Sequence, residues 1–256
     1  MMQIPTPSNT AINPLIASLA TTFQLPFTIE NKTSNIPENI QNIKPQNNLK
    51  PKNGKRLVLD LDETVVHTFA PKDNFMDFVN DLTEDQRKRL YVLEFPGGET
   101  LFGYIRPGVE NLLKVAFEEF ESVGVWSAGT EFYVHEIVKL IFRGEKPLFV
   151  MTRNDCNELK INKKEMPCRY KPLENIYKKH PTHNESNTLI IDDRKDICKL
   201  NCLNNIQIPE FNLTSSNCTT LLNDNSLDIL AKWFQTDDFR NTNDVRTLKS
   251  KSPFKI

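Results

Sequence analysis

Three short apolar runs stand out against a mostly polar chain. They are Leu57-Val58-Leu59, Ser122 to Trp126 and Thr188 to Ile191, and each has the length of a strand. Continuous apolar runs of this kind are typical of parallel strands that are covered on both faces. Between the second and third runs, apolar residues at 132, 137, 138 and 141 have the spacing of an amphipathic helix. The pattern predicts an α/β fold with a parallel sheet.

A predicted insert of about 71 to 104 separates the first run from the second. Asp81 to Leu90 has the composition of a short helix, with Thr83 as a possible cap. Tyr91 to Phe95 and Thr100 to Ile105 flank a Pro-Gly-Gly-Glu turn and predict a β-hairpin. The insert is therefore a flap, too small for a lid domain. The alternative is a structural edge hairpin with no role in the choice of substrate.

The two ends of the chain differ from its middle. Residues 1–53 are rich in Asn, Pro, Thr and Ser without a sustained period, which predicts a disordered N-terminal segment. Residues 236–256 are polar and predict a flexible C-terminal tail. The remaining residues, 54–235, are enough for one globular domain.

Charge and cysteine content narrow the class of protein. A net charge of −1 and a pI near 6.5 argue against a nucleic-acid surface as the main role of the domain. The five cysteines are odd in number and lack zinc-site spacing, so free thiols in a reducing compartment are the simplest interpretation. No apolar run reaches the length of a membrane span. We expect an intracellular protein, nuclear or cytoplasmic.

Two carboxylates, Asp60 and Asp62, directly follow the first run. Residues two apart in an extended chain point the same way, so both would face one crevice while Leu61 turns into the core. Two like charges about 4 Å apart cost about 4 kcal/mol at an effective dielectric near 20, so the pair needs a cation or a shared proton. Mg²⁺ is a hard cation that suits such oxygen ligands.

The other two runs also end in oxygen-bearing side chains. Asp192-Asp193 follows the third run, and Ser127 follows the second. In open α/β sheets, ligands bind at the carboxyl ends of the strands, where the strand order reverses. A structural interpretation stays open for each residue by itself, because Asp, Ser and Thr are also common turn and helix-cap residues.

Several motifs carry a resemblance to a known family. Asp60-Leu61-Asp62-Glu63-Thr64 resembles the DxDxT signature of the haloacid dehalogenase superfamily. The residues that follow it are similar to the version in carboxy-terminal-domain phosphatases of RNA polymerase II and their small relatives. The further matches lie between about Arg56 and Phe234, in the family's order: Arg106-Pro107-Gly108-Val109, Trp126-Ser127-Ala128-Gly129, Arg153-Asn154-Asp155-Cys156, Tyr170-Lys171-Pro172-Leu173 and Asp192-Asp193.

The resemblance implies a Rossmann-like parallel sheet with helices on both faces and a phosphatase mechanism through an aspartyl phosphate. Asp60 would be the nucleophile, and Asp62 would protonate the leaving group and then activate water. Lys171 would neutralise charge on the phosphoryl group. Nearby alternatives for this lysine are Lys163, Lys164, Lys178 and Lys179.

The resemblance also implies the phosphate and metal contacts. Thr64 and Ser127 would orient phosphoryl oxygens through their hydroxyl groups. Mg²⁺ would be held by a carboxylate oxygen of Asp60, the backbone carbonyl of Asp62 and the Asp192-Asp193 pair, with Asp193 as the direct ligand and Asp192 acting through water or through hydrogen bonds to the ligands.

An uncovered site favours a protein substrate. Only 43 residues separate Ser127 from Lys171, which leaves no room for a large cap, and small phosphometabolites usually need a lid. We expect a phosphoserine or phosphothreonine phosphatase whose substrate is a phosphoprotein; the polymerase tail is the family's best-known target. Two alternatives stay open: a small-molecule phosphatase acting on a nucleotide or sugar phosphate, and a non-catalytic scaffold.

Overall fold

The computed structural model describes residues 54–69, 75–159, 168–213 and 218–255. The predicted N-terminal segment, 1–53, lies outside these residues, so that prediction is not tested.

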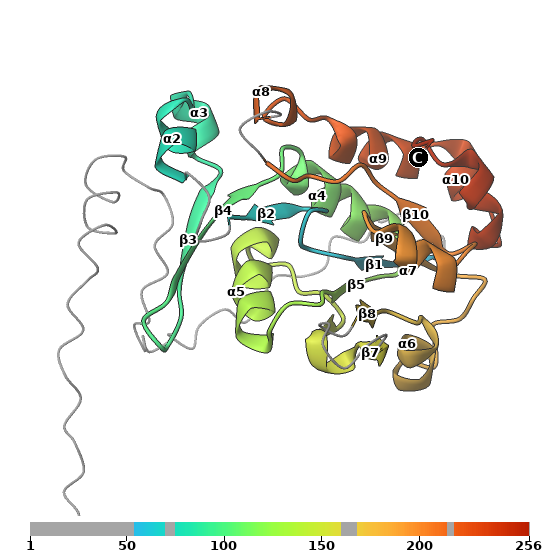
Figure 1. Ribbon diagram of the computed structural model, residues 1–256. Coiled ribbons are helices and arrows are strands. Elements are labelled where there is room, and N and C mark those ends of the chain that lie inside the picture. Colours follow the sequence, from blue (N-terminus) through green and yellow to red (C-terminus); the bar gives the residue numbers. More distant parts are fainter. Residues whose placement is uncertain (1–53, 70–74, 160–167, 214–217, 256) are drawn as a thin grey trace, which may run out of the picture.

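A five-stranded parallel sheet forms the centre of the molecule (Figure 1). Its order is β10-β9-β1-β5-β6, and every pair of neighbours is parallel. The chain runs from β1 to β5 and β6 on one side, then crosses to β9 and β10 on the other. The strand order therefore reverses at β1, which confirms the predicted α/β fold. The strands are β1 Arg56–Leu59, β5 Ser122–Trp126, β6 Val150–Met151, β9 Thr188–Asp192 and β10 Asn205–Gln207.

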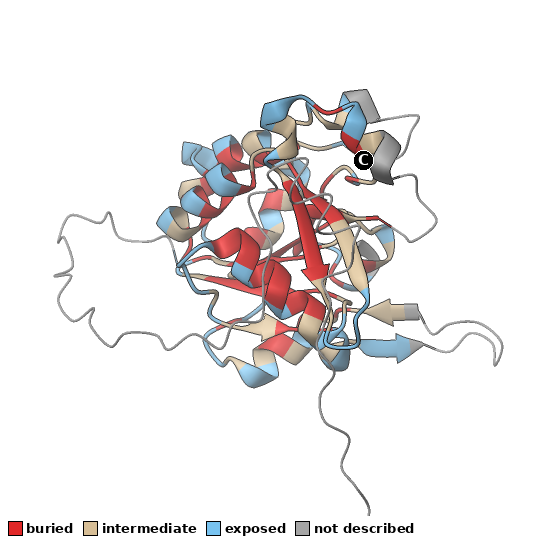
Figure 2. Ribbon diagram, turned by 90° about the vertical axis from the view of Figure 1, so that its left-hand side faces the viewer, coloured by how far each residue is buried: buried red, intermediate tan, exposed pale blue. Residues whose placement is uncertain are grey.

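Alternate residues of β1 enter two different hydrophobic clusters. Leu57 and Leu59 belong to the larger cluster, which also contains residues of α4, α5 and α9. Val58 belongs to a second cluster, shared with residues of α6 and α7. The sheet is thus buried on both faces, while the outer faces of the helices are exposed (Figure 2). The helices are α4 Val109–Glu119, α5 Glu131–Phe142, α6 Glu174–Lys179, α7 Lys195–Leu200 and α9 Ser226–Phe234.

The insert forms the predicted flap. Strands β3 (Leu90–Glu94) and β4 (Thr100–Ile105) make the hairpin, and β4 also pairs with β2 (Val66–Thr68). Thr83 caps α3 (Glu84–Arg87) through a full capping box with Gln86, as its composition predicts. A further short helix that the sequence did not reveal, α2 (Phe75–Asn80), precedes it.

The segment between α5 and α6 contains only small elements where the structure describes it. These are β6, a 3₁₀ turn η1 (Arg153–Asp155) and a short antiparallel pair, β7 (Asn157–Leu159) and β8 (Cys168–Tyr170). No cap domain is present in the described part of this segment, in agreement with the sequence. None of the helices in the described residues is long and apolar enough to span a membrane.

The C-terminal residues correct the prediction of a flexible tail over 236–256, because the described part of it, 236–255, is folded. After α8 (Cys218–Leu221) and α9, the chain forms α10 (Asp237–Arg240) and the 3₁₀ helix η2 (Val245–Lys251). The rings of Phe120 and Phe239 lie 5.5 Å apart, and Val245 and Leu248 are fully buried. These few apolar residues are spaced by polar ones, so the sequence pattern hid their burial.

Candidate active site

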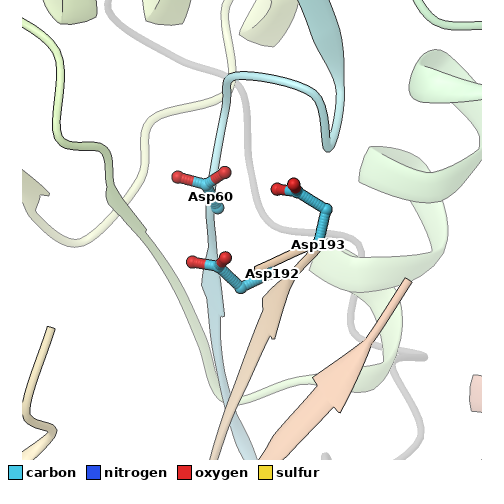
Figure 3. A group of neighbouring side chains, drawn as sticks. All are labelled: Asp60, Asp192 and Asp193. Atoms are coloured by element: carbon cyan, nitrogen blue, oxygen red, sulfur yellow. The ribbon is translucent and has the colours of Figure 1, made fainter. Parts of the chain in front are cut away.

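Three carboxylates converge at the carboxyl edge of the sheet, beside the point where the strand order reverses. Asp60 follows β1, and its backbone N–H donates to the carbonyl of Ile191 at 3.0 Å, which extends the ladder between β1 and β9. Asp192 ends β9, and Asp193 follows it. One carboxylate oxygen of each aspartate lies within 4.8 Å of the others (Figure 3). The two acidic motifs are therefore brought together, as the sequence predicts.

Lys171 lies inside this cluster. Its Nζ donates to Oδ1 of Asp60 and, at 2.8 Å, to Oδ2 of Asp192. The side chain is only 1% exposed. Among the alternative lysines, Lys178 is exposed and Lys179 pairs with Asp155 at 2.5 Å. Lys163 and Lys164 lie outside the described residues.

The electrostatics of the cluster show an excess of negative charge. Burial raises the pKa of Asp60, and the positive charge of Lys171 only partly opposes this. Burial alone would lower the pKa of Lys171, but the charges of Asp192 and Asp60 outweigh it and raise that pKa, so the lysine stays a cation. Burial and the charge of Asp192 raise the pKa of Asp193 to about 7. One lysine does not balance three carboxylates, and their oxygens suit a divalent cation such as Mg²⁺.

Asp62 has different surroundings, although it lies two residues from Asp60 and faces the same cleft. Its Oδ2 accepts a hydrogen bond from Oγ of Ser127 at 2.9 Å, and its Oδ1 accepts one from the hydroxyl of Tyr133 at 2.5 Å. No lysine or arginine bonds to this carboxylate in the described part of the chain. Neutral hydroxyl groups therefore hold Asp62, whereas a cation holds Asp60.

The two predicted phosphate-binding hydroxyls both contact carboxylates. Oγ of Ser127 donates to Asp62, and Oγ1 of Thr64 donates to Oδ1 of Asp193 at 3.1 Å. Both residues are fully buried, and neither lines the cleft. The structure thus brings Thr64 and Ser127 to the acidic groups, where they orient side chains.

Sequence reasoning missed Tyr133. It is the third residue of α5, whose N-cap is Thr130 and not Ser127. The only signal available was its position on the helix that follows Ser127. From the sequence, an aromatic residue near the start of a helix is more often interpreted as a core residue. The hydrogen bond of its hydroxyl group forms only in the folded structure.

A buried arginine fixes the loop that carries the DxDxT motif. Arg106 is fully buried, and its Nη1 donates to the carbonyl of Thr64 at 2.9 Å. Its Nε and Nη2 form a two-point ion pair with Asp224 at 2.9 and 3.1 Å. Helix α4 begins shortly after Arg106, and Gly108 is its N-cap with a left-handed φ of 87°. This glycine lets the chain turn from β4 into α4.

A cleft of about 610 Å³ opens over the site. Its floor contains Asp60, Asp62 and Lys171, and one wall contains Phe95 and Leu101 of the flap. The flap contacts α5, since the rings of Phe95 and Phe132 lie 4.9 Å apart. Further charged residues on the walls are Glu63, Arg153, Asp193, Arg194 and Glu210. The cleft is open to solvent and has charges of both signs on its walls.

Comparison with protein families decides what kind of site this is. Residues 55–246 match the model of the family described as NLI interacting factor-like phosphatase, which covers most of the chain. The chain belongs to this family. The resemblance found in the motifs is thereby confirmed at the level of the family, whose description is that of a phosphatase.

Comparison with solved structures supports the fold through one of the two matches described below. The structure of Fcp1, described as an essential RNA polymerase II CTD phosphatase, matches with a TM-score of 0.53 and 19% identity. The match covers 78% of this chain and 70% of that one. A fission yeast Fcp1 variant bound to beryllium fluoride matches with a TM-score of 0.46 and 23% identity, over 78% of this chain and 53% of that one. No curated protein gave a significant match in sequence.

Proposed function

We propose that this family member is an Mg²⁺-dependent phosphoprotein phosphatase. It would remove phosphate from serine or threonine through a phosphoryl group carried on Asp60. One observation carries the proposal: the carboxylate of Asp60 lies at the floor of an open cleft, held by Lys171 within a cluster of three aspartates.

In the first half of the reaction, a carboxylate oxygen of Asp60 forms a bond to phosphorus while the bond to the serine or threonine oxygen breaks. The carboxylate is held for this attack by Lys171 and by the rigid end of β1. The ammonium group of Lys171 stays charged and opposes the negative charge that spreads over the phosphoryl oxygens.

Asp62 would move the protons. It gives a proton to the departing serine or threonine oxygen in the first half and removes one from the attacking water in the second half. Water then adds to phosphorus, the bond to Asp60 breaks and inorganic phosphate leaves. The position of Asp62 in the cleft, two residues from the nucleophile, supports this assignment.

The donors at the site fit Mg²⁺. Asp60, the backbone carbonyl of Asp62 and Asp193 would hold it, and when bound it supplies positive charge next to the phosphoryl oxygens. Asp192 is less available, because Oδ2 accepts from Lys171 and Oδ1 accepts from the backbone N–H of Arg194 at 3.0 Å. Asp193 is less buried and lines the cleft. This difference supports Asp193 as the direct ligand.

The open cleft supports a polypeptide substrate. It has no cap in the described residues, and the apolar flap residues Phe95 and Leu101 stand beside the charged floor. Such a surface can contact a chain on either side of a phosphorylated residue. One similar structure is described as an RNA polymerase II CTD phosphatase, so a phosphorylated polymerase tail is a reasonable first substrate to test.

A paired substrate panel tests the proposal. The purified chain is given phosphoserine and phosphothreonine peptides, nucleotide and sugar phosphates, and an aryl phosphate, each with Mg²⁺ and with a chelator. We expect Mg²⁺-dependent release of phosphate, with a higher kcat/KM for peptides. Preference for phosphometabolites would favour the small-molecule alternative. Failure to hydrolyse any phosphate ester would leave a binding scaffold.

A further inference from the structure

A row of hydroxyl groups leads from the flap to Asp62. The hydroxyl of Tyr133 donates to Oδ1 of Asp62 at 2.5 Å and lies 2.7 Å from Oγ1 of Thr68. Oγ1 of Thr68 also lies 2.7 Å from the hydroxyl of Tyr91. That last hydroxyl is 3.4 Å from the backbone carbonyl of His67. These residues come from α5, β2 and β3, so the row crosses the base of the flap.

Both phenols in the row are permanent hydrogen-bond donors. Tyr133 is 6% exposed and Tyr91 is 1% exposed. Burial raises the pKa of each of them, so both stay protonated at neutral pH. The hydroxyl proton of Tyr133 points to Asp62, and Thr68 is left to bridge the two phenol oxygens.

Two glycines leave room for these rings. A Cβ atom at Gly103, opposite Tyr91 in the hairpin, would lie 2.1 Å from Cζ of Tyr91. A Cβ atom at Gly129 would lie 2.7 Å from Cδ1 of Tyr133. Any larger residue at either position would displace a tyrosine. The placement of both tyrosine hydroxyl groups therefore requires a residue without a side chain at positions 103 and 129.

We propose that Tyr133 is a positioning residue for Asp62, and that Thr68 and Tyr91 hold Tyr133 in place. This inference rests on the proposed function, in which Asp62 transfers the protons. Ser127 holds one oxygen of the carboxyl group and Tyr133 holds the other. With both oxygens held, the group cannot turn about its Cβ–Cγ bond, and the same edge faces the leaving oxygen.

The consequence is a dependence on the leaving group. An alkoxide leaving from phosphoserine needs a proton in the transition state, whereas a nitrophenolate leaves without one. A residue that only supports the fold would affect both substrates alike. A residue that positions the proton donor affects only the reaction of phosphoserine. The ratio of the two rates therefore separates these roles.

The test is Tyr133→Phe, which keeps the ring and removes the hydroxyl group. We expect kcat/KM to fall about tenfold or more for a phosphoserine peptide and less than about twofold for p-nitrophenyl phosphate. The ratio kcat/KM is used because it reports phosphoryl transfer to Asp60 and not the later hydrolysis. Thr68→Val should give a smaller loss with the same dependence on leaving group. Equal losses on both substrates, or no loss, would overturn the inference.

Two controls separate this inference from the proposed function. Tyr177→Phe, on α6 and away from the cleft, should leave both rates unchanged. In an Asp62→Asn background, adding Tyr133→Phe should cause no further loss on the peptide, because the residues act as a unit. A wild-type protein that hydrolyses neither substrate would contradict the proposed function itself. A different result is an active wild type in which Asp62→Asn loses more activity on the peptide than on p-nitrophenyl phosphate, while Tyr133→Phe does not. That result would contradict only the role of Tyr133.

Discussion

Asp60 and Asp62 are two residues apart, yet their surroundings differ in kind. Asp60 is 4% exposed and contacts a buried lysine beside two more carboxylates. Asp62 is more exposed and contacts two neutral hydroxyl groups. The two carboxylates thus follow the same strand and face the same cleft, but they lie in two different environments.

The difference indicates a division of labour. Charged groups surround Asp60, where the proposed phosphoryl transfer would require negative charge to be neutralised. Neutral donors hold Asp62, which in the proposed mechanism would both give and take a proton. Neighbouring carboxylates with contrasting environments are a known basis for contrasting roles in catalysis.

The largest effect is expected at the nucleophile. Asp60→Asn should lower kcat/KM for p-nitrophenyl phosphate by about 10⁴-fold or more, because no carboxylate nucleophile remains at this position. Asp62→Asn should lower this kcat/KM less, because transfer of the phosphoryl group from this substrate to Asp60 needs no proton on the leaving group. Steady-state kinetics on folded variants, checked by circular dichroism, measures both. Similar losses in the two variants would remove the contrast between the aspartates.

Removal of the buried cation should destabilise the metal-free protein. Lys171→Met leaves Asp60 and Asp192 buried without their partner, and we expect the free energy of unfolding to fall by about 3 to 5 kcal/mol in the presence of a chelator. Mg²⁺ should restore part of this loss. The control is Lys179→Met, which breaks an ion pair with an exposed lysine and should cost less than about 1 kcal/mol. Urea unfolding measures the loss of stability in both variants. Similar losses in Lys171→Met and Lys179→Met would contradict this prediction.

The stability of the metal-free protein should depend on pH through Asp193. Its pKa is raised to about 7 in the folded protein, while the unfolded chain ionises near 4. Between these values this carboxyl group binds more protons in the folded state, so its contribution to stability falls as the pH rises from about 4 to 7 and then levels off, a change of about 2 to 4 kcal/mol. Asp193→Asn should remove this contribution, so the variant should gain stability relative to the wild type as the pH rises through this range. A difference in stability between the two proteins that does not change with pH would contradict the assignment.

The smallest effect concerns metal affinity. Asp193→Asn should weaken the binding of Mg²⁺ at least about tenfold, since a charged ligand becomes a neutral one. Asp62→Asn should leave this affinity nearly unchanged, because only the backbone carbonyl of Asp62 is proposed as a ligand. Isothermal titration of the two variants makes the comparison. Equal weakening in both would place the side chain of Asp62 among the ligands.

The three inner strands of the sheet, β1, β5 and β9, were predictable because their apolar runs are short and buried on both faces. The flap was predictable because turn residues separate its two strands. The packed C-terminal segment was not, since Phe239, Val245 and Leu248 form no periodic pattern. Their burial depends on tertiary contacts with residues such as Phe120. Local sequence patterns thus revealed strands whose apolar residues recur at regular positions. They did not reveal the C-terminal segment, where single apolar residues are buried by tertiary contacts.

The acidic cluster was predictable because parallel strands end at one edge of the sheet. Lys171 followed from its place in a motif. The hydroxyl groups were harder to interpret: contacts of Thr64 and Ser127 with phosphate stay a prediction, and the sequence did not reveal that both donate to carboxylates. Tyr133 was missed altogether. Which acceptor a hydroxyl group finds depends on distances of less than 1 Å in the folded protein, and residue spacing does not encode them.

The most direct test of the account is to trap the phosphoryl group on the enzyme. The Asp62→Asn variant is mixed with p-nitrophenyl phosphate and Mg²⁺, quenched in acid during turnover, digested and analysed by mass spectrometry. Nitrophenolate leaves without a proton, so the phosphoryl group should still be transferred to the enzyme. The variant lacks the base that activates water for hydrolysis of the intermediate, so phosphorylated enzyme should accumulate. The account predicts one phosphoryl group, on Asp60. A phosphoryl group on any other residue, or none while nitrophenolate is released, would contradict it.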